Sequence, residues 1–279
     1  KECVSFLRES REGPFFLYFA HMYVHLPLFV PESFLKQSCN GAYGGAVAEI
    51  DWSVAVLLNE LKQLGLDENT LVLFTSDNGA RCTHGGTNGP LRGTKGTTWE
   101  GGMRVPLIAR WPGVVPAGRV CSEVASAIDF LPTLAGLAGA EVPTDRTLDG
   151  KDLAPLLTGE EGAASPHEQF FYYQCDDLAA VRSGKWKLHV AKRGQELLEL
   201  YDLEADLSET TNLAEAHPDV VQDLLARLEA CRADLGDART GVTGADCRPL
   251  GRVENAKPLT EYSEDHPYIQ AMYDLPDKG

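Results

Sequence analysis

Residues 71–102 constrain the fold of this chain more than any other stretch of its sequence. The stretch opens with an unbroken apolar run at 71–74 and turns polar at 75–79, where Asp77 and Asn78 stand side by side. A short apolar run without alternation is typical of a central strand in a parallel sheet, covered on both faces. Because ligands of open α/β sheets bind beyond the carboxyl ends of such strands, we expect both side chains at the edge of a binding site.

The chemistry of this edge favours a cation and an anion together. Asp77 and Asn78 offer a carboxylate and an amide oxygen, the hard ligands that Ca²⁺ and Mg²⁺ prefer. The glycine-rich loop that follows contains Arg92 and Lys95, so positive side chains stand close to the expected cation site. Asp-Asn-Gly is also a common turn sequence, and a plain turn is the alternative interpretation of the tripeptide alone.

The charge of the chain is uneven, and it narrows the classes of partner. The formal net charge of -16 at pH 7 argues against nucleic acid. Residues 81–119 nevertheless hold six Lys or Arg side chains against Glu100 alone. This basic segment indicates either an anion site or arginines that pair with the acidic remainder of the chain.

No apolar run reaches the roughly 18 residues of a membrane span. None of the seven cysteines forms a CxxC pair, so zinc is not expected.

The elements predicted before residue 165 are those of an α/β domain. Apolar residues at helical spacing predict a helix over 46–64, which Gly65 ends in a left-handed cap. A short turn leads from this helix into the strand at 71–76, which makes half of a crossover unit. The other expected elements are strands at 14–20 and 105–111 and a helix at 127–138 that Asp129 caps.

The pattern changes near Ser165. Consecutive strands are predicted at 170–173, 180–190 and 197–203, with a turn or a bulge at 183–184. Partial alternation over 185–190 predicts a half-exposed antiparallel sheet. A helix over 218–235 and an irregular acidic tail follow. We therefore predict two parts, an α/β part over 1–165 and a small α+β subdomain over 166–279.

The ordered set of motifs resembles the sulfatases, in the arylsulfatase branch of the alkaline phosphatase superfamily. The matching pieces are 15–18 with His25-Leu26-Pro27, Asp77-Asn78-Gly79, 91–106, 129–133, 200–203 and 212–213. Each motif alone is weakly specific, but together they follow the order of the family over most of residues 14–213. The resemblance implies a partial alkaline-phosphatase-like mixed sheet with flanking helices. It also implies a small C-terminal antiparallel sheet with a packed helix.

The resemblance implies roles at four positions. Asp77 and Asn78 match the second pair of ligands to an active-site Ca²⁺, with Mg²⁺ as the alternative ion. Lys95 matches the lysine that contacts the sulfate group, and His25 matches the histidine that contacts sulfate and assists the leaving oxygen. Arg92 lies in the matching loop and receives no role. A cation, an ammonium and an imidazole aimed at sulfate oxygens would stabilise the charge that moves during cleavage.

One departure from the family pattern concerns the nucleophile. The family uses a formylglycine, made from Cys or Ser in a Cys/Ser-x-Pro-x-Arg segment that lies near the N-terminus with the first pair of Asp ligands. Neither is present here, and the nearest string, at 247–252, places its arginine one residue too late. We expect the chain to be the C-terminal portion of a sulfatase and to be inactive by itself. Its parent would need a formylglycine-generating enzyme.

The implied function is an arylsulfatase-type sulfuric ester hydrolase that cleaves sulfate from a small sulfated aryl, sugar or lipid substrate with a divalent cation. Two alternatives stay open. One is a phosphodiester or phosphonate ester hydrolase of the same superfamily, and the other is a fragment that binds sulfated ligands without catalysis. The resemblance implies a secreted, periplasmic or lysosomal-type compartment. The substrate and the oligomeric state do not follow from the sequence, because specificity resides in loops around the site.

Overall fold

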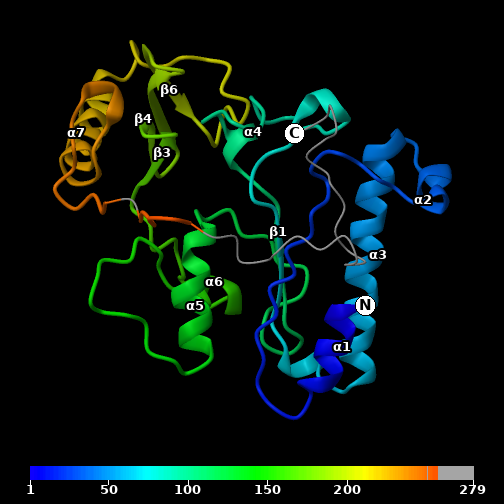
Figure 1. Ribbon diagram of the computed structural model, residues 1–279. Coiled ribbons are helices and arrows are strands. Elements are labelled where there is room, and N and C mark those ends of the chain that lie inside the picture. Colours follow the sequence, from blue (N-terminus) through cyan, green and yellow to red (C-terminus); the bar gives the residue numbers. More distant parts are fainter. Residues whose placement is uncertain (250, 257–279) are drawn as a thin grey trace. The chain divides into compact units, whose positions relative to one another are not determined.

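The computed structural model describes residues 1–249 and 251–256, and the chain divides into two compact units (Figure 1). Of the described residues, the first unit comprises Lys1–Leu64 with 248–249 and 251–256, and the second comprises Gly65–Cys247. The predicted division at residue 165 falls inside the second unit and stays a prediction. The predicted irregular tail lies partly outside the described residues. Within the described part, no helix is long and apolar enough to cross a membrane.

The first unit is built on a long helix. Its helices are α1 (Glu2–Glu9), α2 (Glu32–Gln37) and α3 (Gly41–Gln63), and α1 and α2 both pack on α3. The helix predicted over 46–64 is confirmed, and it begins already at Gly41. Gly65 follows with a φ of 71°, the left-handed conformation expected of a residue that ends a helix.

The strand predicted over 14–20 does not form. No described strand pairs with this segment, and Phe16 and Tyr18 are 72% and 80% exposed. A strand is held by a neighbour that takes its backbone hydrogen bonds. The apolar composition of the segment carries no information about whether such a neighbour is present.

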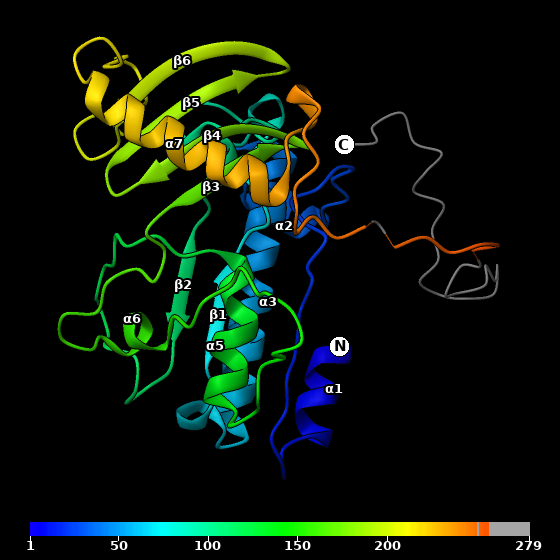
Figure 2. The same cartoon turned by 90° about the vertical axis from the view of Figure 1, so that its left-hand side faces the viewer.

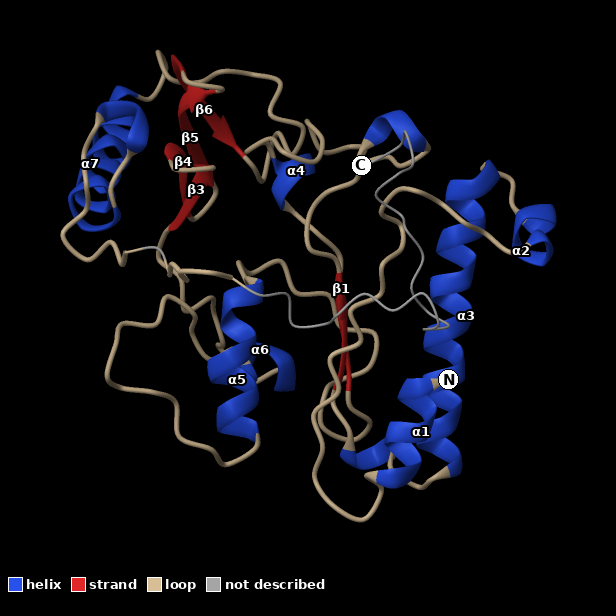
Figure 3. Cartoon of the chain, viewed as in Figure 1, coloured by secondary structure: helices blue, strands red, loops and turns tan. Residues whose placement is uncertain are grey.

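The segment at 71–76 does form a strand, but its pairing differs from the prediction. Strands β1 (Val72–Thr75) and β2 (Leu107–Arg110) pair antiparallel, with Val72 opposite Arg110. The interpretation of β1 as a central parallel strand covered on both faces is wrong for the described residues, since Phe74 is 36% exposed and Ile108 is 60% exposed. The predicted α/β fold class is nevertheless confirmed, because the chain combines small sheets with flanking helices (Figure 3).

Short helices in the second unit precede β1, lie between β1 and β2, and lie between β2 and the C-terminal sheet. They are η1 (Asp67–Asn69), η2 (Cys82–His84), α4 (Glu100–Met103), η3 (Ala127–Asp129), α5 (Phe130–Leu137) and α6 (Ala154–Thr158). The helix predicted over 127–138 is confirmed as η3 followed by α5. Ser126 is the N-cap of η3 and Asp129 is the acidic partner of its capping box. Asp129 is also the N-cap residue of α5, but its side chain makes no capping hydrogen bond there. The buried Asp129 carboxylate also lies 2.8 Å from His167 Nε2.

The C-terminal sheet has the predicted antiparallel order. Its strands are β3 (Phe170–Gln174), β4 (Asp177–Ser183), β5 (Trp186–Lys192) and β6 (Gln195–Asp202), paired in sequence order. Helix α7 (Pro218–Leu235) has the predicted bounds and lies along the sheet (Figure 2). Leu188 and Leu200 of the sheet pack with Leu224 and Leu228 of α7 in one buried cluster. The short helix η4 (Ala238–Thr240) follows.

The prediction of a half-exposed sheet is wrong. Lys187 and His189 alternate with Leu188 along β5, and they are 0% and 1% exposed. Alternation shows which residues share a face of a strand, but it does not show whether another segment covers that face. Here the polar face of β5 is covered by the segment around Trp99 and Glu100.

Candidate active-site segment

The strand exit, residues 77–80, follows β1 directly. Asp77 is exposed and makes no hydrogen bond or ion pair with any residue that the structure describes. Asn78 donates its Nδ2 to the carbonyl of Gly79 at 3.0 Å, and its backbone carbonyl accepts from Ser76 Oγ at 3.2 Å. No described residue donates to Asn78 Oδ1. The strand exit therefore presents a carboxylate and an amide oxygen that the fold itself does not use.

Glycines allow the loop that carries Lys95 to pack directly against the strand exit. The N–H of Gly79 donates to the carbonyl of Gly102 at 3.0 Å. A Cβ atom at Gly79 would lie 1.8 Å from the carbonyl oxygen of Gly101, and one at Gly102 would lie 2.2 Å from that of Thr97. A side chain at Gly79 would force the strand exit and the loop apart, and one at Gly102 would distort the loop itself.

Hydrogen bonds around Ala80 hold the backbone of Lys95 near Asp77. The N–H of Lys95 donates to the carbonyl of Ala80 at 3.2 Å, and Thr94 Oγ1 donates to the same carbonyl at 2.8 Å. Asn88 accepts from the Ala80 N–H at 2.7 Å and donates to its carbonyl at 2.9 Å. The backbone of Lys95 is thus hydrogen-bonded to Ala80, three residues after Asp77 in the sequence. Convergence of the side chains on one ion and one anion stays a prediction.

The remaining predicted site residue, His25, belongs to the first unit. Its ring is exposed, and Nδ1 lies 2.8 Å from the carbonyl oxygen of Leu26. In the neutral tautomer that donates this hydrogen bond, Nε2 carries no proton and can accept one. The approach of His25 to Lys95 stays a prediction.

The donor set at the strand exit fits part of a hard-cation site. Asp77 and Asn78 supply carboxylate and amide oxygens, but Ca²⁺ takes about 6–8 oxygen ligands. No group of three or more His, Cys, Asp or Glu residues that could hold a metal ion lies within the described residues. Oxygen ligands other than those of Asp77 and Asn78 would be needed to complete the coordination of the ion.

Arg92 has a structural use that the sequence did not reveal. Its Nη1 donates to Tyr201 Oη at 3.1 Å and to the carbonyl of Glu209 at 2.7 Å, and its guanidinium lies 3.7 Å from the centre of the Trp99 ring. Arg92 is therefore held by the fold, but through a hydroxyl, a backbone carbonyl and an aromatic ring rather than an acidic side chain. The second interpretation of the basic segment holds for Arg110, which pairs with Asp67 through two hydrogen bonds of 2.8 and 2.9 Å.

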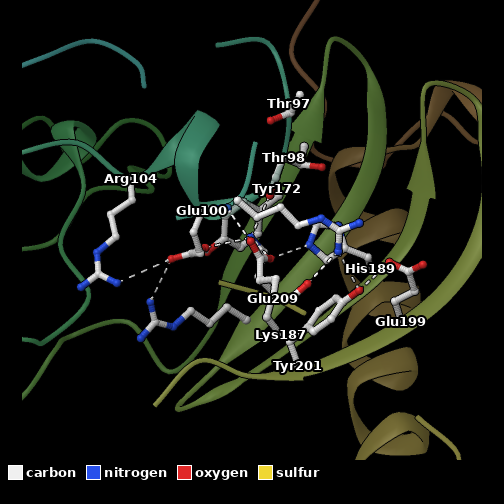
Figure 4. A network of polar contacts seen from close by, with 12 residues as sticks. Thr97, Thr98, Glu100, Arg104, Tyr172, Lys187, His189, Glu199, Tyr201 and Glu209 are labelled. Atoms are coloured by element: carbon white, nitrogen blue, oxygen red, sulfur yellow. Dashed lines mark hydrogen bonds and ion pairs between the residues drawn. The ribbon is translucent and has the colours of Figure 1, made fainter. Parts of the chain in front are cut away.

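A buried polar cluster connects the loop to the C-terminal sheet (Figure 4). We define it as Glu100, Lys187, His189 and Glu209, each at most 2% exposed. Lys187 Nζ lies 2.8 Å from Glu100 Oε1, 3.0 Å from Glu209 Oε1 and 2.8 Å from the carbonyl of Thr98. Glu209 Oε2 accepts from the backbone N–H of Glu100 at 2.8 Å. Each carboxylate in the buried cluster therefore faces a donor.

The buried cluster shifts two pKa values in the same direction. Burial raises the pKa of Glu209, but its hydrogen bond with His189 and the charge of Lys187 outweigh burial, so the net pKa is lowered. Burial lowers the pKa of His189, and the hydrogen bond with Glu209 opposes this only in part. At neutral pH the cluster therefore holds an ionised Glu209 and a neutral His189.

Comparisons with known proteins agree with the fold and with the order of the motifs. Residues 1–140 match the sulfatase family model, and residues 94–234 match that of the C-terminal part of N-sulphoglucosamine sulphohydrolase. The chain is 48% identical over 196 residues to steryl-sulfatase of Rattus norvegicus, covering 67% of this chain and 33% of that protein. It is 40% identical over 264 residues to arylsulfatase A of Homo sapiens, covering 83% of this chain and 51% of that protein.

A solved structure shows the same architecture. The crystal structure of Ps i-CgsB in complex with k-i-k-neocarrahexaose matches with a TM-score of 0.76 and 30% identity, over 88% of this chain and 56% of that one. The chain spans 33% to 51% of the length of the two curated relatives named above. Because the family model covers residues 1–140 of 279, the chain belongs to the sulfatase family.

Proposed function

We propose that this chain carries one part of the active site of an arylsulfatase-type sulfuric ester hydrolase. The observation that carries the proposal is the hydrogen bond from the Lys95 N–H to the Ala80 carbonyl, 3.2 Å long, which holds a basic residue beside Asp77. Membership of the sulfatase family supports it.

Each predicted site residue then has a task. Lys95 binds the anionic oxygens of the sulfate group, and His25 contacts sulfate and assists the leaving oxygen. Asp77 and Asn78 hold part of the coordination shell of a divalent cation, Ca²⁺ or alternatively Mg²⁺. When bound, this cation supplies charge neutralisation for the sulfate oxygens.

The nucleophile lies outside these 279 residues in our proposal. No Cys/Ser-x-Pro-x-Arg segment occurs in the sequence, and covalent catalysis needs an activated nucleophile within reach. We propose that a longer protein supplies a formylglycine, made by a formylglycine-generating enzyme, and that the 279-residue chain alone is inactive. The compartment expected from the family, secreted, periplasmic or lysosomal-type, is part of the same proposal.

The substrate is proposed at the level of a class. The relatives named above include a steryl-sulfatase and an arylsulfatase, and the similar solved structure contains a neocarrahexaose. We propose a small sulfated aryl, sugar or lipid substrate. The names of these relatives point to different substrates, so the proposal stays at the level of this class.

The proposal is tested with two proteins, the 279-residue chain and a longer protein that adds the modified formylglycine segment. With Ca²⁺ present, we expect the longer protein to release nitrophenol from p-nitrophenyl sulfate and the 279-residue chain to release none. Turnover by the 279-residue chain would show that the nucleophile lies within these residues and that our assignment is wrong. If a correctly modified longer protein cleaves only bis-p-nitrophenyl phosphate or a phosphonate ester, the proposed sulfatase reaction is wrong and the phosphodiester or phosphonate ester hydrolase takes its place.

A further inference from the structure

The loop that carries Lys95 is held by the C-terminal sheet as well as by the strand exit. Gln174, the last residue of β3, donates its Nε2 to the carbonyl of Gly96 at 2.8 Å. The Gln174 Oε1 accepts from the backbone N–H of Arg193 at 3.0 Å. The amide is therefore held at both ends, and this pair of bonds fixes which atom is the nitrogen.

The position of Gln174 matters because Lys95 lies between two anchors. On one side, the Lys95 N–H donates to the Ala80 carbonyl at the strand exit. On the other side, the carbonyl of Gly96 accepts from Gln174. Gly96 has a φ of 82°, a left-handed conformation that only some residues adopt readily. The Gln174 bond is made to Gly96 in this conformation.

We propose that Gln174 is a positioning residue for the reaction, because it fixes the backbone that aims Lys95 at the sulfate group. The effect on catalysis rests on the proposed function of Lys95, whereas the effect on the loop does not. The side-chain amide of Gln174 bonds the backbone of Gly96 and Arg193, so in this proposal it acts through Lys95.

The test variant is Gln174→Glu. A carboxylate keeps the acceptor for Arg193 but loses the donor for Gly96. Since the Gln174–Gly96 hydrogen bond is exposed, we expect the variant to fold. The matched control is Glu196→Ala on β6 of the same sheet, whose carboxylate is 85% exposed and pairs only with Arg239 among the described residues.

The first measurement is amide hydrogen exchange by mass spectrometry on the 279-residue chain. We expect peptides covering 92–99 to exchange about fivefold faster in Gln174→Glu, since a net hydrogen bond of about 1 kcal/mol is lost. Peptides covering 218–235 serve as the internal reference and should not change. An unchanged rate over 92–99 would overturn the positioning role, whatever the activity of the longer protein.

The second measurement is a double-mutant cycle in the longer protein with p-nitrophenyl sulfate. Gln174→Glu should lower kcat/KM about tenfold, within the range of one lost hydrogen bond, and should have no further effect in a Lys95→Ala background. The control Glu196→Ala should leave kcat/KM unchanged. An equal loss in both backgrounds would show that Gln174 acts elsewhere. If the longer protein without substitutions hydrolyses no sulfate ester, the proposed function fails. The hydrogen-exchange measurement then tests by itself whether Gln174 positions the loop.

Discussion

The strand exit and the buried cluster use charged residues in opposite ways. At the strand exit, Asp77 is exposed and has no partner within the described residues. In the buried cluster, Lys187 is fully buried and contacts Glu100 and Glu209 at 2.8 and 3.0 Å. A buried charge with every partner in place belongs to the structure, because removing one partner leaves the others uncompensated. An exposed, unpartnered carboxylate at the end of a strand is instead available to a ligand.

The largest expected effect follows from removing the central charge of the buried cluster. Lys187→Met leaves Glu100 and Glu209 buried without their shared cation, and we expect it to cost about 3–5 kcal/mol of unfolding free energy. Urea denaturation at pH 7 measures this loss.

The matched control is Lys185→Met. Lys185 pairs with Asp202 at 2.6 Å, but its side chain is 41% exposed, so this pair should contribute no more than about 1 kcal/mol. Equal losses for the two variants would remove the distinction between a buried and an exposed ion pair in this fold.

A smaller effect should appear as pH dependence. The pKa values of His189 and Glu209 are both lowered in the folded state, so the unfolded chain binds more protons and stability falls as pH falls. The His189 contribution should be lost below about pH 6.5 and the Glu209 contribution below about pH 4.3, the ordinary values of these groups.

Urea denaturation of wild type and His189→Gln between pH 7 and pH 4 separates the two contributions. The variant keeps a hydrogen-bonding side chain beside Glu209 but does not titrate, so its stability should depend less on pH between 6.5 and 5. A parallel decline in both proteins would assign the acid sensitivity to other groups.

The smallest stability effect is expected at the strand exit. Asp77→Asn should change the unfolding free energy by no more than about 0.5 kcal/mol, as for other surface substitutions. In the longer protein, the same change should raise the Ca²⁺ concentration needed for half-maximal activity. Destabilisation by more than about 1 kcal/mol would show that Asp77 has a structural role.

Local patterns predicted the helices well. The apolar spacing of α3 and α7 and the left-handed Gly65 are properties of contiguous residues, and they needed no knowledge of the rest of the chain. The pairing of β1 and the absence of a strand at 14–20 depend on distant segments, so composition alone could not decide them.

The buried cluster was missed for a similar reason. Alternation along β5 placed Lys187 and His189 on one face, but it did not reveal that Glu100 and Glu209 cover this face. Lys187 and Glu100 are 87 positions apart in the sequence, and Glu100 and Glu209 are 109 apart. The strand exit was predicted from the contiguous pattern at 71–79, and the resemblance assigned its roles because the order of this motif among the others is specific.

The most direct test of the difference between the two regions is Lys95→Ala, measured for both activity and stability. In the longer protein with p-nitrophenyl sulfate, we predict that kcat falls by about 10²–10³, the usual cost of removing one donor to a developing charge. The urea midpoint should stay at the wild-type value, and the control Lys36→Ala, at a lysine that is 71% exposed, should keep full activity. Full activity of Lys95→Ala, or a loss that matches a fall in the urea midpoint, would contradict the assignment of the loop beside the strand exit to catalysis.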